Sequence, residues 1–326
     1  MFTEYFGLTS SPFRLTPDAR FFFGSKSHRK ALAHITYGLS QGDGFVVITG
    51  EVGAGKTTLV EHLWSQLNPN EYIAAKISTT QLSPTDFLRV VVSGFGLEKT
   101  RRDKESMLSA LAELFRANHI AGKRTLLVID EAQNLPFATL EELRMLANLA
   151  IGHSAPLETF LLGQPQFRNI LASRDAEQLR QRVFTCYHLG ALDAEEVKAY
   201  VEHRLQIASW SGDPSFADES FAAIYRHTDG IPRKINLLCS RLLLSAFLEE
   251  RHAITAQDTE AVAAEWNNEL EAIAVRKPAR TVGTVAPVLN GAASDRIESL
   301  ERRVARHDHL LKLSLDVMSR LGEPLE

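Results

Sequence analysis

The sequence has very little cysteine and no long apolar run. Only two cysteines, Cys186 and Cys239, occur among its 326 residues, and no CxxC spacing is present. A disulfide framework and a cysteine-based zinc site are therefore not expected, and a reducing compartment fits. No window of about 18 apolar residues exists that could span a bilayer. The N-terminus lacks the basic stretch and following apolar stretch of a signal peptide. These features predict a cytoplasmic protein.

The sequence also lacks a strong excess of either charge. Lys and Arg total 36 against 40 Asp and Glu, which gives a formal net charge of −4. This balance argues against a protein that binds nucleic acid or anionic lipid through a large overall positive charge, but it does not exclude a local basic patch. Hydrophobic residues make up 44% and charged residues 23%, as in globular proteins that bury a sizeable core. A chain of this length predicts about two domains.

Five short apolar runs alternate with segments of helical periodicity in the first 190 residues. The runs cover residues 45–50, 71–78, 123–130, 157–163 and 183–189. Strands separated by helices favour a parallel sheet covered by helices on both faces. We therefore predict an α/β domain over residues 1–190.

The pattern becomes wholly helical after Leu189. Helical spacing covers residues 193–209, 216–227, 232–250 and 256–269, with Asp193 and Thr255 as candidate N-caps and Asp213 as a further one. These segments predict an all-α domain over 191–270. Residues 271–294 have no periodicity and the composition of a linker. Residues 295–322 are helical again, and their apolar stripe suits either a short coiled coil or docking on a surface.

One segment matches a phosphate-binding motif. Residues 50–57, GEVGAGKT, satisfy G-x-x-x-x-G-K-[ST] between a predicted buried strand and a helix. Backbone N–H groups of such a loop wrap a β-phosphate, and side chains at Gly53 or Gly55 would obstruct that approach. Lys56 would supply charge to the β- and γ-phosphates and Thr57 a hydroxyl to Mg²⁺. The predicted nucleotide-binding residues of this segment are Gly50, Glu51, Val52, Gly53, Ala54, Gly55, Lys56, Thr57 and Thr58.

A pair of acidic residues ends the third predicted strand. In LLVIDE, Asp130 lies at the tip of a buried strand and Glu131 follows it directly. A carboxylate placed there can hold Mg²⁺ through water, and the next one can polarise an attacking water. Two acids in this position favour hydrolysis over phosphoryl transfer to a second substrate.

These motifs, with the helical domain, resemble the AAA+ ATPases. Several stretches further resemble the ExeA/GspA-type secretion ATPases, and among them the shorter ATPases of exosortase/PEP-CTERM export loci. The stretches are FGLTSSPFRLTPDARFFF, GFVVITGEVGAGKTTL, LLVIDEAQNL, FLLGQPQF, QRVFTCYHL and GIPRKINLLCSRLLL, within about residues 1–268. Larger members continue into a membrane segment and a peptidoglycan-binding domain, whereas this sequence continues into the linker and helix described above.

The resemblance implies roles for residues outside the two motifs. Gln164 matches the polar sensor that contacts the γ-phosphate or the attacking water. Arg233 matches the lid arginine that reports on the γ-phosphate, since a guanidinium can bind two phosphate oxygens. Arg180 and Arg182 match the segment that supplies an arginine finger to a neighbour's site, and Arg182 is the preferred candidate.

The resemblance also implies an adenine side formed by residues 1–40. Phe22, Phe23 and His28 lie where the family lines its adenine pocket, although the same aromatic run suits core packing equally well. ATP and Mg²⁺ are the implied ligands.

The sequence favours a MgATP-dependent AAA+ ATPase that energises or regulates envelope secretion or export of polysaccharide or protein. Such a protein would form a homo-oligomer with active sites between subunits, and its C-terminal helix could recruit a membrane-associated export component at the inner membrane. One alternative is a DNA-binding regulator similar to the MuB/TniB/TnsC-type transposition ATPases, with Lys99–Lys104 as the candidate contact. The other is an ATP-binding scaffold with little turnover.

Overall fold

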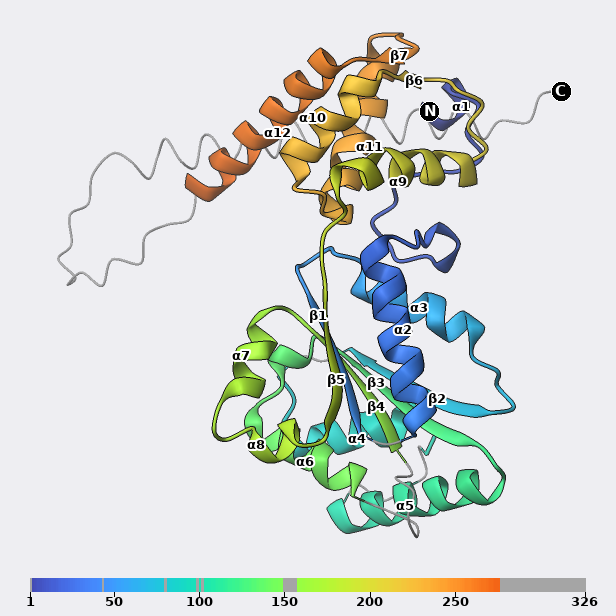
Figure 1. The fold of residues 1–326 in the computed structure, drawn as a ribbon, viewed down its shortest axis with the longest axis vertical. Helices are drawn as coiled ribbons and strands as arrows, with labels where there is room; N and C mark the ends of the chain where they lie inside the picture. Colours follow the sequence, from blue (N-terminus) through green and yellow to red (C-terminus); the bar gives the residue numbers. More distant parts are fainter. Residues whose placement is uncertain are drawn as a thin grey trace, which may run out of the picture. The chain divides into compact units, whose positions relative to one another are not determined.

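The computed structural model describes residues 2–42, 44–78, 81–97, 100, 103–148 and 157–275 (Figure 1). The chain divides into two units, Met1–Ala272 and Ile273–Glu326, and the fold described below is that of the first. Three residues of the basic run at 99–104 (99, 101 and 102), the linker from residue 276 and the helix predicted over 295–322 lie outside the described residues. None of the described helices combines the length and apolar character needed to cross a membrane.

Within the described residues, five strands form a parallel sheet in the order β2-β3-β4-β1-β5. Their bounds are β1 Phe45–Gly50, β2 Tyr72–Ser78, β3 Arg124–Asp130, β4 Leu157–Gly163 and β5 Val183–Leu189. Every residue of β1 and β4 is buried, which explains why their sequences are nearly continuous in apolar residues. The five apolar runs thus coincide with the five strands, and the predicted α/β fold is confirmed.

Helices cover both faces of this sheet (Figure 1). On one face, Val46 and Ile48 pack against α2 (Lys26–Gln41) and α3 (Lys56–Gln66). Phe45 and Val47 face the second core, which involves five further helices. These are α4 (Pro84–Gly94), α5 (Lys104–Ile120), α6 (Phe137–Ala147), α7 (Gln166–Ala172) and α8 (Glu177–Arg180). Consecutive residues of β1 therefore enter opposite cores, as the two-residue period of a strand requires.

A mainly helical domain with its own core follows β5. Its helices are α9 (Ala194–Ile207), α10 (Asp218–Thr228), α11 (Pro232–Leu248) and α12 (Ala256–Val275). The predicted helices match these segments, but Phe216 belongs to a short strand instead. That strand, β6 (Ser215–Phe216), pairs in parallel with β7 (Ala253–Ile254). Strands of two residues have no alternation that a sequence pattern could show.

The first residues of the chain pack into the core of the helical domain. Phe6, Leu8 and Phe13 follow α1 (Phe2–Tyr5) and are buried with side chains of α9 and α11. The Thr9 amide also donates to the carbonyl of Ala208 over 2.9 Å. The helical domain is thus assembled from two separate parts of the chain. Residues 14–25, with the short helix η1 (Ala19–Phe21), connect its first part to α2.

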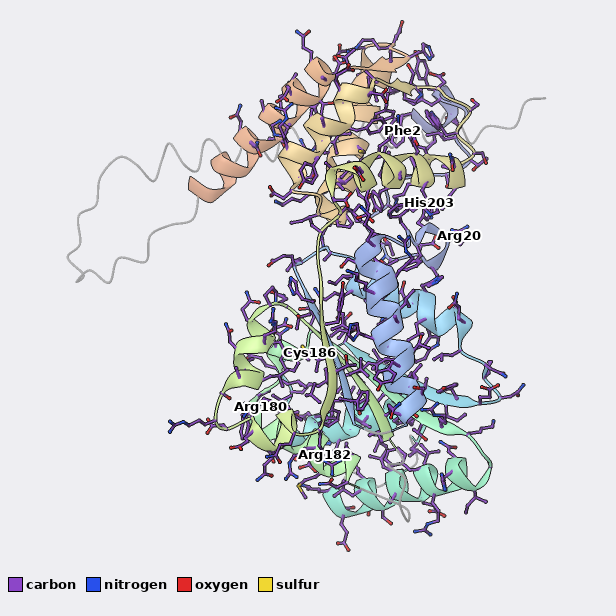
Figure 2. The ribbon with its side chains drawn as sticks, in the orientation of Figure 1. Phe2, Arg20, Arg180, Arg182, Cys186 and His203 are labelled. Atoms are coloured by element: carbon purple, nitrogen blue, oxygen red, sulfur yellow. The ribbon has the colours of Figure 1, made fainter. Side chains whose placement is uncertain are left out.

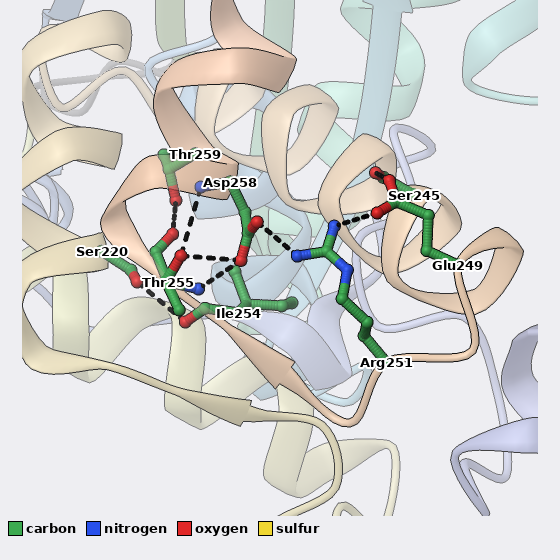
Figure 3. Close-up of polar contacts among 8 residues, drawn as sticks. All are labelled: Ser220, Ser245, Glu249, Arg251, Ile254, Thr255, Asp258 and Thr259. Atoms are coloured by element: carbon green, nitrogen blue, oxygen red, sulfur yellow. Dashed lines mark hydrogen bonds and ion pairs between the residues drawn. The ribbon is translucent and has the colours of Figure 1, made fainter.

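The start of α12 illustrates how local polar contacts fix this domain (Figure 3). Thr255 Oγ1 accepts a hydrogen bond from the Asp258 amide at 3.3 Å, and Asp258 Oδ2 accepts one from the Thr255 amide at 2.8 Å. This reciprocal cap satisfies backbone donors that the first turn of a helix leaves unpaired. Arg251 binds the other oxygen of Asp258, and Ser220 donates to the carbonyl of Ile254. Thr255 is therefore confirmed as the N-cap, as Asp193 is for α9.

Candidate functional site

The loop after β1 and the helical domain line one cleft. Its walls are residues 14–18 and 21–23, the loop and start of α3, Glu131, and side chains of α9 and α11. We call residues 50–57 with Asp130 and Glu131 the phosphate end. We call the part formed by Phe21–Phe23, Tyr200, Arg204 and Asn236 the aromatic end.

Two glycines of the phosphate end have backbone conformations that other residues rarely adopt. Gly53 has φ 85° and Gly55 has φ 97°. A Cβ on Gly53 would lie 2.3 Å from Cβ of Arg233, and one on Gly55 would lie 2.8 Å from Nε2 of His28. Arg233 and His28 therefore leave no room for a side chain at either position. This constraint adds to the close approach of a phosphate that the motif predicts.

Lys56 is the first residue of α3 and only 5% exposed. Its Nζ donates to the carbonyl oxygens of Gly50 at 2.8 Å and Glu51 at 3.0 Å. Burial lowers the pKa of the Lys56 ammonium, and the negative charges of Glu131, Asp130 and Glu51 oppose that shift. The buried ammonium of Lys56 has lost part of its hydration. The site therefore favours the binding of a further anionic group beside it.

Thr57 and Asp130 meet although 73 residues separate them in the sequence. Thr57 Oγ1 donates to Asp130 Oδ2 over 2.8 Å, and Asp130 Oδ1 accepts from the Glu131 amide at 2.9 Å. The pairing arises because β1 and β3 are parallel and both end at the same edge of the sheet. A hydroxyl and a carboxylate side by side are hard oxygen donors of the kind that Mg²⁺ prefers, so these residues fit the predicted metal.

Glu131 lies at the turn that leaves β3, with φ 56°. Its carboxylate Oε2 accepts hydrogen bonds from two side-chain amides, those of Gln133 and Gln164. The Gln164 Nε2 is 3.0 Å away, and Gln164 directly follows β4. The predicted sensor and the predicted base are therefore in direct contact. Gln133 was not predicted from the sequence, although it lies in the same DEAQ stretch.

Arg233 lines the cleft from the first turn of α11. Its backbone amide donates to the carbonyl of Gly53 over 3.2 Å, and its side-chain carbons lie over the same glycine. The helical domain therefore touches the phosphate loop directly. A change in the conformation of the loop would therefore alter the contacts made by the first turn of α11.

Phe22 and Phe23 both line the cleft and pack against neighbouring aromatic side chains. Phe22 stacks on His62 of α3 with ring centroids 3.9 Å apart, and Phe23 meets the edge of Tyr200 at 5.7 Å. His28 is 5% exposed, and its Nδ1 lies 2.7 Å from Oγ of Ser25. Burial lowers the pKa of His28 to about 4, so its imidazole is neutral at physiological pH.

Arg204 of α9 joins the N-terminal segment to the helical domain at the aromatic end. It is 7% exposed and donates to the carbonyls of Pro12 at 2.7 Å and Arg14 at 3.2 Å. It also donates to the Tyr200 hydroxyl at 3.0 Å, and its guanidinium lies 4.7 Å from the ring centroid of Phe21. This residue was not predicted from the sequence. The available signal was a charged residue on the apolar stripe of α9.

Arg180 and Arg182 are not among the residues that line the cleft. Figure 2 shows both far from Arg20 and His203, toward the other end of the sheet's strands. Arg182 directly precedes β5, and its carbonyl accepts from the amide of Phe45 at the start of β1. The phosphate loop follows the other end of β1, about 20 Å away at roughly 3.3 Å per strand residue. The side chain of Arg182 donates to Asn148, and that of Arg180 to the carbonyls of Leu171 and Ser173.

Comparisons with known proteins agree with this fold. A family model described as an AAA domain matches residues 39–171. General secretion pathway protein A of Aeromonas hydrophila is 40% identical over 262 residues, which are 79% of this chain and 47% of that protein. The chain thus spans about half the length of this curated relative.

Solved structures of low sequence identity show the same fold. ORC2 of Aeropyrum pernix in its ADP form aligns with a TM-score of 0.59 and 15% identity, over 78% of this chain and 72% of that one. Cdc6p from Pyrobaculum aerophilum gives 0.57 and 15%, over 81% and 70%. A point mutant of Thermotoga maritima RuvB gives 0.51 and 18%, over 73% and 69%.

Proposed function

The chain belongs to the AAA+ proteins of the general secretion pathway protein A type, and on this premise we propose that it binds MgATP in the cleft and hydrolyses it. One observation carries the proposal. Lys56, the Thr57–Asp130 pair and Glu131 come from separate places in the sequence and meet at the phosphate end. Catalysis of phosphoryl transfer rests mainly on positioned charge, and this arrangement supplies it.

The residues of the phosphate end suit a magnesium-bound triphosphate. The Lys56 ammonium donates to carbonyls of its own loop and can turn to the β- and γ-phosphate oxygens instead. Thr57 and Asp130 would hold Mg²⁺, which would neutralise charge on the phosphates. The positive end of α3 would add to the attraction of the anion.

Glu131 would act as the general base. It takes a proton from a water molecule while the water oxygen attacks the γ-phosphorus and the bond to the β–γ bridging oxygen breaks. The products are ADP and inorganic phosphate. Gln164 would orient the water or the γ-phosphate, and Arg233 would link the position of the helical domain to the phosphates. Phe22, Phe23 and His28 would form the adenine side.

We propose that a second copy of the chain completes each site through Arg182. The position of Arg182 at the start of β5 supports this, because it prevents the side chain from reaching its own phosphate loop. Arg180 is the second candidate: its side chain donates to two backbone carbonyls of its own chain, whereas that of Arg182 donates to the side chain of Asn148. Such an arrangement would make the ATPase rate depend on protein concentration.

The proposed role is to energise or regulate an envelope secretion or export system from the cytoplasmic side of the inner membrane. The name of the Aeromonas relative supports a link to secretion. Residues 295–322 would recruit the membrane-associated component. Three of the four basic residues in the run proposed for DNA contact lie outside the described residues, so the DNA-binding hypothesis stays a prediction.

The substitution Glu131→Gln tests the proposal. It keeps the size of the side chain and one acceptor oxygen but removes the base, so ATP should still bind while kcat falls about 100-fold or more. ATPase rate and ATP affinity are to be measured in parallel. Glu113→Gln, an exposed change on α5, serves as the control and should leave both unchanged. An undiminished rate in Glu131→Gln would contradict the mechanism. Tight ATP binding by the unaltered chain without turnover would favour the scaffold alternative.

A further inference from the structure

The side-chain amide of Gln133 bridges two parts of the phosphate end. Gln133 lies in η2 (Ala132–Asn134), the single turn after β3, and is half-buried. Its Nε2 donates to Oε2 of Glu131, and its Oε1 accepts from the backbone amide of Gln164 at 2.9 Å. The bridge requires one donor and one acceptor on the same side chain, which an amide provides and a carboxylate or hydrocarbon does not.

The conformation of Glu131 explains why its side chain needs external support. A φ of 56° is an unfavourable backbone conformation for a residue other than glycine, and surrounding contacts must hold it. The bridge from Gln133 is one such contact. It binds the carboxylate to the end of β4, the strand that also positions Gln164.

Gln133 and Gln164 both donate to Glu131 through their side-chain amides, but only Gln164 has a second role in the proposed reaction. In the proposed reaction Gln164 turns its side chain to the γ-phosphate or the water and so releases Glu131. Gln133 is anchored by the backbone of Gln164 and not by its side chain, so it can keep its bond while Gln164 moves. Only one of the two contacts can therefore persist through the reaction.

We infer that Gln133 is a positioning residue that keeps the Glu131 carboxylate directed at the attacking water while Gln164 engages the nucleotide. The inference rests on the proposed hydrolysis of ATP. Gln133 itself touches neither water nor phosphate in this role. It acts through Glu131, and a small misplacement of a catalytic group of this kind costs about 100-fold in rate.

The test compares Gln133→Met with the unaltered chain, with Glu131→Gln and with the double variant. Methionine has a similar length but cannot form either hydrogen bond. We expect kcat to fall about 10- to 100-fold while ATP affinity and KM change less than about 2-fold. In the Glu131→Gln background, where no base remains to be positioned, Gln133→Met should produce no further loss. Gln133→Glu keeps the acceptor but places a carboxylate against Glu131, so it should be no better than methionine.

A purely structural role gives a different result. Loss of ATP affinity in Gln133→Met, or an equal fall in kcat with and without Glu131, would overturn the inference. So would full activity of Gln133→Met in a chain that hydrolyses ATP, and the proposed function would then stand. Absence of turnover in the unaltered chain would overturn the proposed function and this inference together. Gln206→Met, an exposed change on α9, is the matched control and should behave as the unaltered chain.

Discussion

The two ends of the cleft are built in opposite ways. At the phosphate end, eight consecutive residues form the loop, and two adjacent acids complete it. At the aromatic end, the chain before α2 meets α9 and α11, and the buried Arg204 holds the segments together. The first end depends on backbone geometry and charge, and the second on tertiary packing. Substitutions at the phosphate end should therefore affect nucleotide binding most, and those at the aromatic end should affect stability most.

Lys56→Ala should have the largest effect on binding. The variant loses charged hydrogen bonds to the phosphates, so affinity for ATP and ADP should fall about 100-fold or more. Stability without nucleotide should change far less, because burial lowers the pKa of Lys56 and so already disfavours its charged form in the folded chain. Calorimetric titration with ADP and denaturation without nucleotide measure the two quantities.

Lys76→Ala is the matched control for Lys56. Lys76 lies on β2, pairs with Glu61 and does not line the cleft, so its removal should leave nucleotide affinity unchanged. Equal losses of affinity in the two variants would mean that the loss comes from a general disturbance of the fold. They would contradict the expectation that substitutions at the phosphate end affect nucleotide binding specifically.

Arg204→Met should show the reverse pattern. The carbonyls of Pro12 and Arg14 and the hydroxyl of Tyr200 would lose a buried donor, at a cost of about 2–4 kcal/mol in stability. Trp210 and Trp266 both belong to the helical domain, so urea denaturation followed by fluorescence in a Trp64→Phe background reports on that domain.

Arg226→Met provides the comparison for Arg204. Arg226 is 63% exposed and pairs with Glu260 at the surface, so its loss should cost less than about 1 kcal/mol. If the two arginine variants were equally stable, the buried network would not hold the N-terminal segment in place.

The difference between the two ends also determines what the sequence reveals. The phosphate loop, Asp130 and Glu131 are recognisable because the chemistry fixes residue types at fixed spacing within one short segment. The three central strands, β1, β3 and β4, are recognisable because burial on both faces leaves few polar residues in them, whereas the edge strands β2 and β5 are only partly buried and were recognised as short apolar runs. Gln164 and Arg233 were assigned by resemblance alone, and both lie at the phosphate end.

The aromatic end offered no comparable signal. Tyr200, Arg204 and Asn236 lie on two helices, and only tertiary packing brings them to residues 12–23. The same holds for Phe6, Leu8 and Phe13, whose partners lie more than 150 residues away in the chain. Periodicity places such residues on a helix face or in an apolar run, but it does not say which distant face they meet. Gln133 is intermediate, since its position next to Glu131 is visible but its bond to the end of β4 is not.

His28 lies between the two ends and should show the smallest effect, which depends on pH. Its folded-state pKa of about 4 is below the usual 6.5, so protonation favours the unfolded chain. Stability should therefore be fully present above pH 6.5 and decrease as the pH falls towards 4. Between pH 7 and pH 5 the loss attributable to His28 is about 2 kcal/mol, at 1.36 kcal/mol per pKa unit. Denaturation of His28→Asn, which keeps an acceptor for Ser25, should show a pH dependence weaker by that amount. The exposed His119→Asn should retain the dependence of the unaltered chain. An unchanged dependence in His28→Asn would mean that the imidazole is solvated and is not held in its neutral form by burial.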